Sequence, residues 1–164
     1  MAATPAPEPH AGTTAPRVDF DASVAFLITS LANKLNNRAS RQLKRRLGVG
    51  LMEWRAMVLL AVEGGASPGR IAQVAGVDKS VVSRAVTSLE RRGLLRVSAD
   101  SQPGRQTHLT LTAAGLTLHD LGIGDMLARE AALLETFTPE ERAATIGLLK
   151  RLTANHAQAG ERET

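Results

Sequence analysis

Apolar residues recur at a helical period in the first part of the chain, and this pattern predicts a long helix there. The stripe falls at i, i+3, i+7 and i+11 and consists of Val24, Leu27, Leu31 and Leu35. It predicts a helix over residues 19–47, which Gly48 and Gly50 end. A helix with one apolar stripe is not stable alone in water, so this stripe must pack against another surface.

Two shorter helices are predicted next. One covers residues 51–63, and its apolar stripe consists of Trp54, Val58 and Ala61. Ser67 and Pro68 are typical of a helix N-cap and first turn, and they open a short helix that ends at Gly76.

A further short helix lies directly after Gly76. Asp78 is its predicted N-cap, and Gly93 ends it. Two short helices on either side of a turn of three or four residues have the spacing of a helix-turn-helix.

The hydrophobic period changes from 3.6 to 2 after Gly93. Residues 94–100 and 105–112 both alternate, and the sequence between them, "SQPGR", is typical of a turn. The pattern predicts two strands joined as a β-hairpin. A hairpin that directly follows a helix-turn-helix is a wing.

Two long helices are predicted in the last third of the chain. Thr112 caps the first, over residues 113–135, and Thr138 with Glu141 forms a capping box for the second. The second runs to about His156. Its apolar stripe consists of Leu148, Leu149 and Leu152. The stripes of these helices and of the first helix pack against each other or against a second copy of the chain.

Gly122 and Gly124 stand inside the helix over 113–135, where each glycine costs roughly 1 kcal/mol relative to alanine. Close packing against another helix explains such a pair, and a bend that lets the parts of the protein on either side of it change their spacing is the alternative. No strand precedes the pair and a third glycine is absent, so it is not a nucleotide-binding fingerprint.

The helix after Asp78 carries two opposed rows of side chains. One row is apolar and packs the helix onto its own domain: Val81, Val82, Ala85, Val86 and Leu89. The other is polar and faces outward: Ser80, Ser83, Arg84, Thr87 and Arg91. Short hydroxyls allow close approach to a DNA groove, and Arg84 can contact guanine with two hydrogen bonds. Lys79, Arg91 and Arg92 are placed for phosphates. The alternative is a row that only solvates a surface helix.

The charge of the chain is concentrated beside this row. The net charge of the 164 residues is +4, and residues 79–105 hold six Lys and Arg against Glu90 and Asp100, which also gives +4. A second basic run, "RQLKRR", covers residues 41–46. Clustered basic charge favours a polyanionic partner, although a solvated helix face has the same composition.

Composition excludes several classes of protein. The chain has no cysteine, so disulfides, thiolate zinc sites and cysteine nucleophiles are excluded. The four histidines show no metal-ligand spacing and no nucleophile–base pattern, so we expect neither an enzyme nor a bound metal or cofactor.

No apolar run approaches the roughly 18 residues that cross a bilayer, and the N-terminus does not resemble a signal peptide. We expect a cytoplasmic protein with a disordered tail over residues 1–18 and a polar tail over 158–164.

Three segments together resemble the MarR family of winged-helix transcription regulators. They are "MEWRAMVLL" from Met52, "IAQVAGVDKSVVSRAVTSLERRGLL" from Ile71 and "GRQTHLTLTAAG" from Gly104. The resemblance covers about residues 21–156. It implies a mainly α fold with a β-hairpin wing, in which residues 51–112 form the DNA-binding lobe of a single domain over 19–157. Residues 19–47 and 113–157 are then the dimerisation helices.

The resemblance also implies a function. The protein is expected to be a homodimeric repressor that places its recognition helices in successive major grooves of a pseudo-palindromic operator. Arg105 stands seven residues before Thr112 and is expected to enter the minor groove. The family usually has an acidic residue two places before that arginine, and here this position is Pro103. The predicted DNA-binding set is Ser67, Lys79, Ser80, Ser83, Arg84, Thr87, Arg91 and Arg105. A winged helix used only for protein–protein contacts is the alternative function.

Many members of this family release DNA when a small aromatic carboxylate or phenolic compound binds between the dimerisation helices and the DNA-binding lobe. The candidate ligand-binding residues here are Asn33, Asn37, Arg38, Trp54, Met57 and His119. Each also has a structural interpretation, because Trp54 suits the core and the polar residues suit a solvated or dimer-contacting surface.

Overall fold

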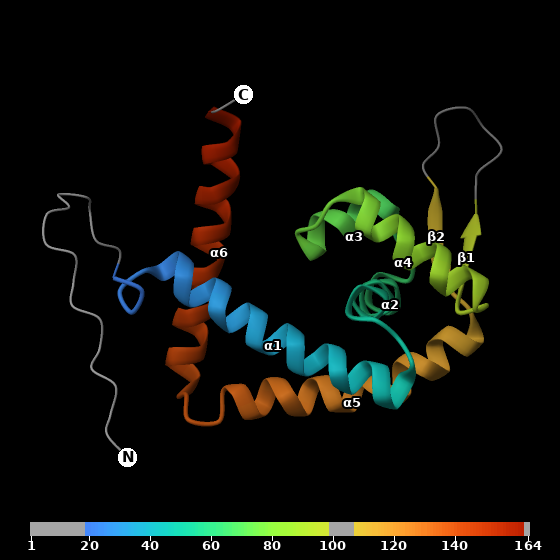
Figure 1. Cartoon of the computed structure of the whole chain (residues 1–164), viewed down its shortest axis with the longest axis horizontal. Helices are drawn as coiled ribbons and strands as arrows, with labels where there is room; N and C mark the ends of the chain where they lie inside the picture. Colours follow the sequence, from blue (N-terminus) through green and yellow to red (C-terminus); the bar gives the residue numbers. More distant parts are fainter. Residues whose placement is uncertain (1–18, 99–106, 163–164) are drawn as a thin grey trace, which may run out of the picture.

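Helices dominate the computed structural model of the chain, which describes residues 19–98 and 107–162 and the side chains of these residues up to 159. Within those ranges six helices and one antiparallel strand pair follow the predicted order, which confirms the fold class (Figure 1). The elements are α1 (Val24–Leu47), α2 (Leu51–Glu63), α3 (Pro68–Ala75), α4 (Lys79–Arg91), β1 (Leu95–Ser98), β2 (His108–Leu111), α5 (Ala113–Leu133) and α6 (Pro139–Arg162). The predicted tail over 1–18 and the wing turn, with Asp100, Pro103 and Arg105, lie outside the described residues.

The core lies where α2, α3, α4 and the hairpin meet. Its most deeply buried side chains come from all of these elements: Met57, Leu60, Ile71, Val82, Leu89 and Leu109. The hairpin pairs Leu95 with Leu111 and Ser98 with His108. It is also joined to the α2–α3 connection, because Ala66 and Leu109 exchange backbone hydrogen bonds of 3.0 and 2.9 Å. The wing is therefore fixed to the same core that holds α4.

The capping residues predicted from the sequence are confirmed at three helices. The hydroxyl oxygen of Ser67 accepts from the backbone N–H of Arg70 at 3.1 Å, and that of Thr112 accepts from Gly115 at 3.1 Å. Thr138 and Glu141 form the reciprocal capping box. Asp78 occupies the N-cap position of α4, but its side chain makes no capping hydrogen bond.

Two helix ends differ from the prediction. The first helix begins at Val24 rather than at residue 19, because Ser23 is the N-cap and the Asp19 carboxylate holds a turn before it. The last helix continues to Arg162, through residues that the polar composition assigned to a tail from 158. A segment can be helical and polar on all sides when it only extends an existing helix, because elongation needs no new nucleus.

The two glycines of α5 have different surroundings. A Cβ on Gly122 would lie 2.5 Å from Cη2 of Trp54 and 2.6 Å from Cδ1 of Leu47, so this glycine allows α5 to pack closely on α1 and α2. A Cβ on Gly124 would meet nothing within 4 Å. Close packing therefore explains Gly122 and does not explain Gly124.

The long helices lie to one side of the core. Figure 1 shows α1 and α5 alongside each other, and α6 rising steeply from the end of α5, away from the α2–α4 lobe. Among the described elements, α6 packs extensively on none. The predicted stripes of α1 and α6 are exposed in the single chain, with Val24 53%, Leu31 49% and Leu148 55% exposed. In the described part of the chain, no helix combines the length and apolarity needed to cross a membrane.

Candidate nucleic-acid interface and ligand cavity

The fourth helix, α4, presents the two rows that the sequence predicted. Val82, Ala85 and Leu89 are buried at 0%, 6% and 0% exposure, and Val81 and Val86 are half-buried. The polar row is fully on the exposed side of the helix: Lys79, Ser80, Ser83, Arg84, Thr87 and Arg91. Within the described residues, none of these six side chains has an ion-pair partner or a side-chain hydrogen bond. The row is thus oriented outward by the packing of its opposite face and remains available to a partner.

Two other basic residues near this surface are engaged within the chain. Arg92 donates to the carbonyl oxygen of Gly48 at 3.2 Å and lies 3.7 Å from the Glu53 carboxylate. Arg92 therefore joins the end of α4 to the α1–α2 junction, an engagement that competes with its predicted contact to a phosphate. Arg70 pairs with Glu63 at 2.7 Å, and this carboxylate raises the pKa of Arg70.

The remaining predicted DNA contacts lie on neighbouring elements. Ser67 is half-buried at the N-terminus of α3, where its oxygen accepts a capping hydrogen bond and its O–H is left to donate. Arg96, which is not among the predicted DNA contacts, is also exposed, on β1. Arg105 lies outside the described residues, so its predicted place at the wing tip is not described.

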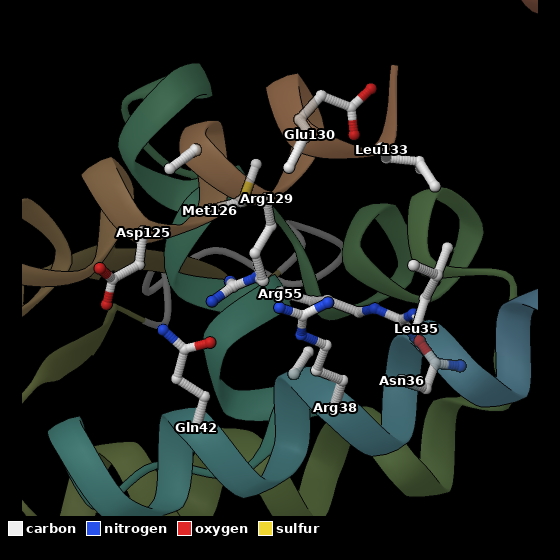
Figure 2. A pocket seen from close by; sticks show the side chains of 13 residues that line it. Leu35, Asn36, Arg38, Gln42, Arg55, Asp125, Met126, Arg129, Glu130 and Leu133 are labelled. Atoms are coloured by element: carbon white, nitrogen blue, oxygen red, sulfur yellow. Dashed lines mark hydrogen bonds between the residues drawn. The ribbon is translucent and has the colours of Figure 1, made fainter. Parts of the chain in front are cut away.

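A cavity of about 770 Å³ lies between α1, α2 and α5. Arg38, Asn36 and Gln42 line it from α1, Arg55 from α2, and Arg129 from α5. Figure 2 shows the side chains of Arg38 and Arg129 extending from opposite helices toward the same space. We call this space the arginine cavity.

Some of the charged side chains that line the arginine cavity have partners within the chain, and others do not. Asp125 is occupied by an ion pair with Arg46, and Arg55 donates to Asn36 Oδ1 at 2.9 Å. Glu130 also lines the cavity, but Figure 2 shows its carboxylate pointing away from Arg38 and Arg129. The Nη1 atom of Arg129 is buried and has no partner among the described residues. A buried guanidinium N–H without an acceptor favours an anionic ligand there.

Of the six candidate ligand-binding residues, only Arg38 lines the arginine cavity. Asn33 and Asn37 are exposed on other faces of α1. Trp54 and Met57 are core residues at 3% and 0% exposure. His119 stacks on Trp54, with ring centroids 5.8 Å apart, and its Nδ1 lies 2.9 Å from the Asp120 carboxylate. These five residues are therefore not part of the cavity, because the helices meet on faces that periodicity alone does not identify.

Four further residues line the cavity and were not predicted from the sequence: Asn36, Gln42, Arg55 and Arg129. One signal for Arg129 was present, because it is the single Lys or Arg in the 21 residues of α5. A lone arginine on a mostly apolar helix is a candidate for a binding role, because a charged side chain is rarely buried unless it is paired.

A helix-turn-helix followed by a hairpin, with the exposed basic row on its second helix, defines a winged-helix DNA-binding protein. A sequence model of the MarR family matches residues 47–106. The chain is 31% identical to a MarR/EmrR family transcriptional regulator from Acinetobacter sp. ADP1, with a TM-score of 0.81 over 86% of this chain and 99% of that one. The chain therefore belongs to the MarR family of transcriptional regulators, and it is a regulator rather than an enzyme.

Two further solved structures are similar. PcaV from Streptomyces coelicolor, in complex with its natural ligand, is 25% identical with a TM-score of 0.69, over 85% of this chain and 98% of that one. MepR from S. aureus, in complex with DNA, shares the fold at 18% identity and a TM-score of 0.72, over 82% of this chain and 97% of that one. No curated protein sequence matches the chain.

Proposed function

We propose that the protein is a homodimeric, sequence-specific repressor that binds a pseudo-palindromic operator and releases it when a small aromatic carboxylate or phenolic ligand binds. The observation that carries this proposal is the exposed polar row on α4, which no described residue engages and which is set directly opposite the buried row of Val82, Ala85 and Leu89. Family membership supports the DNA-binding role, and MepR is a relative in fold that binds DNA.

The side chains of the α4 row suit different parts of DNA. Short hydroxyls at Ser80, Ser83 and Thr87 let the helix backbone approach the floor of the major groove. Arg84, in the middle of the row, is long enough to reach a guanine edge with two N–H groups. Lys79 and Arg91 stand at the two ends of α4, where phosphates flank the groove, and Ser67 can add a contact from the N-terminus of α3. Arg105 completes the proposed set from the wing.

The exposed apolar faces of α1 and α6 support a homodimer. Leu27, Leu31 and Leu35 on α1 are each 40–49% exposed, and Leu149 and Leu152 on α6 are 46% and 40% exposed. Two continuous apolar faces on long helices are unusual on a monomer and typical of an interface. Two-fold pairing of these faces in two copies would relate two α4 helices by the symmetry that a palindromic operator requires.

The arginine cavity supports the proposed response to a ligand. Arg38 and Arg129 can each offer paired N–H groups to a carboxylate, and the buried Nη1 of Arg129 would gain the acceptor it lacks. The cavity joins helices of the dimerisation region to α2 of the DNA-binding lobe. A ligand that binds one arrangement of these helices more tightly shifts the protein toward it, and DNA affinity changes accordingly. PcaV, a relative of similar fold, holds a natural ligand.

Fluorescence anisotropy tests the response. The protein is bound to a labelled duplex from its own promoter region, and benzoate, salicylate or phenol is titrated into the complex. We expect at least one of them to lower the anisotropy and Arg129→Gln to raise the required concentration at least tenfold. Arg41→Gln is the matched control, because Arg41 is an exposed arginine of α1 outside the cavity. Full DNA binding with no response to any of the three, and equal behaviour of both variants, would contradict the effector part of the proposal.

A further inference from the structure

A second cavity, of about 450 Å³, adjoins the arginine cavity and differs from it in chemistry. Its lining is aliphatic: Val58, Leu59 and Val62 from α2, and Ile71, Val74 and Ala75 from α3. Arg55 and Met126 line both cavities, so the two spaces adjoin at these residues. We call the second space the aliphatic groove.

The aliphatic groove runs along α2 from the arginine cavity toward the DNA-binding helices. Arg55, Val58, Leu59 and Val62 fall at i, i+3, i+4 and i+7, which places them on one face of α2. The rise from Arg55 to Val62 is about 10 Å at 1.5 Å per residue. The groove leaves apolar side chains in water, since Val62 is 78% exposed and Val74 is 52% exposed.

We infer that the effector is an amphipathic carboxylate whose head group lies between Arg38 and Arg129 and whose apolar tail lies in the aliphatic groove. Charge complementarity favours this occupant. The cationic arginine cavity and the aliphatic groove adjoin at Arg55 and Met126, and a single ligand with an acidic end and an apolar end is complementary to both. This inference rests on the proposed ligand response. It extends that proposal, because the ligand must then carry an apolar tail in addition to its acidic head group.

The tail would connect the ligand to the DNA-binding motif. Ile71, Val74 and Ala75 belong to α3, the first helix of the helix-turn-helix, and α3 is followed by the Gly76 turn into α4. The head group is held by α1 and α5, while the tail touches α3. Such a ligand therefore contacts the dimerisation helices and the helix-turn-helix together, and it favours whichever relative placement of the two best fits its length.

Calorimetry of the full-length protein with three probes tests the inference. The probes are benzoate, para-hexylbenzoate and para-hexylbenzamide, which separate the contribution of the tail from that of the charge. One fully buried methylene strengthens binding about fourfold, and because the groove is open on one side we expect a total gain of about tenfold to a hundredfold for the hexyl chain. The neutral amide should bind at least tenfold more weakly than para-hexylbenzoate, because it leaves the arginines without a charged acceptor.

A matched pair of variants places the tail. Val74→Asp puts a carboxylate into the groove, whereas Gln73→Asp puts the same charge on the neighbouring residue of α3, which is exposed and does not line the groove. We expect Val74→Asp to remove the advantage of para-hexylbenzoate over benzoate while leaving benzoate affinity unchanged. Gln73→Asp should retain the advantage. Because both positions are exposed, both variants should fold.

Each of the following outcomes would overturn a different part of the inference. If benzoate and para-hexylbenzoate bind equally well, the tail is rejected and the proposed effector response stands. Equal binding of the amide and the acid would reject the arginine head site. If none of the three binds, the inference fails, and so does the part of the proposed response that names an aromatic carboxylate. If Val74→Asp changes the oligomeric state and not the ligand affinity, the groove is a protein interface.

Discussion

The guanidinium of Arg92 donates a hydrogen bond to the carbonyl oxygen of Gly48, at 3.2 Å. The bond joins the end of α4 to the junction of α1 and α2, where Gly48 ends α1 in the left-handed conformation. The adjacent Arg91 is exposed and has no such partner among the described residues. Two neighbouring arginines that look alike in the sequence therefore differ in their contacts within the chain, and the consequences of this difference can be measured.

We expect Arg91→Ala to weaken binding to specific and random DNA alike and to reduce the slope of log affinity against log salt by about 1. Arg92→Ala should leave that slope unchanged and lower the free energy of unfolding by about 0.5–1 kcal/mol, toward the low end because Arg92 is partly exposed. Salt titrations of DNA binding and urea denaturation measure the two quantities. An equal loss of slope in both variants would show that Arg92 also contacts phosphate.

Arg84→Ala should cost sequence-specific binding about 1–3 kcal/mol, because one bidentate base contact is lost. The exposed position of Arg84 predicts an unchanged melting temperature and an unchanged dimer. Parallel titrations with operator and scrambled duplexes measure the effect. If the loss is as large on the scrambled duplex, Arg84 contacts a phosphate and not a base.

The two glycines of α5 should respond in opposite directions to alanine. Gly124→Ala should raise the free energy of unfolding by up to about 1 kcal/mol, since a Cβ there meets nothing and alanine favours the helix. Gly122→Ala should lower it by about 1–3 kcal/mol, because its Cβ would overlap Trp54 and Leu47. Urea denaturation followed by the fluorescence of Trp54, the one tryptophan, measures both. Stabilisation by Gly122→Ala would contradict the packing of α5 against Trp54.

Leu149→Glu should shift the protein from dimer to monomer, because it places a charge on the exposed apolar face of α6. The single chain should still fold, since Leu149 is already 46% exposed. Light scattering coupled to size-exclusion chromatography measures the mass. Val62→Glu is the control, because Val62 is 78% exposed but lies on α2, outside the proposed interface. A Leu149→Glu protein that remains a dimer would place the interface elsewhere.

The fold was predictable where local chemistry decides it. The caps at Ser67, Thr112 and Thr138 and the turn at Gly76 depend on residues within one helical turn, and the α4 rows depend on periodicity alone. The predicted start of α1 was wrong because the residue types of both Asp19 and Ser23 are suitable for an N-cap. Only the structure shows that Ser23 caps the helix Val24–Leu47.

The arginine cavity was less predictable because it depends on how three helices meet. Asn33 and Asn37 share a face of α1, but α5 approaches the face that carries Leu35, Arg38 and Gln42. Periodicity identifies which residues share a face and does not identify which face a distant helix covers. The same limit explains why periodicity did not identify the hydrogen bond from Arg92 to Gly48, which lies 44 residues away in the sequence.

The most direct test of the central proposal is an anisotropy titration of the protein with DNA from its own promoter region and with a scrambled duplex, each at two salt concentrations. The exposed row on α4 predicts tight binding to the promoter duplex, weaker binding to the scrambled one, and a steep loss of affinity with salt. Absence of binding to either duplex at low salt would contradict the account and favour a winged helix that serves protein–protein contacts.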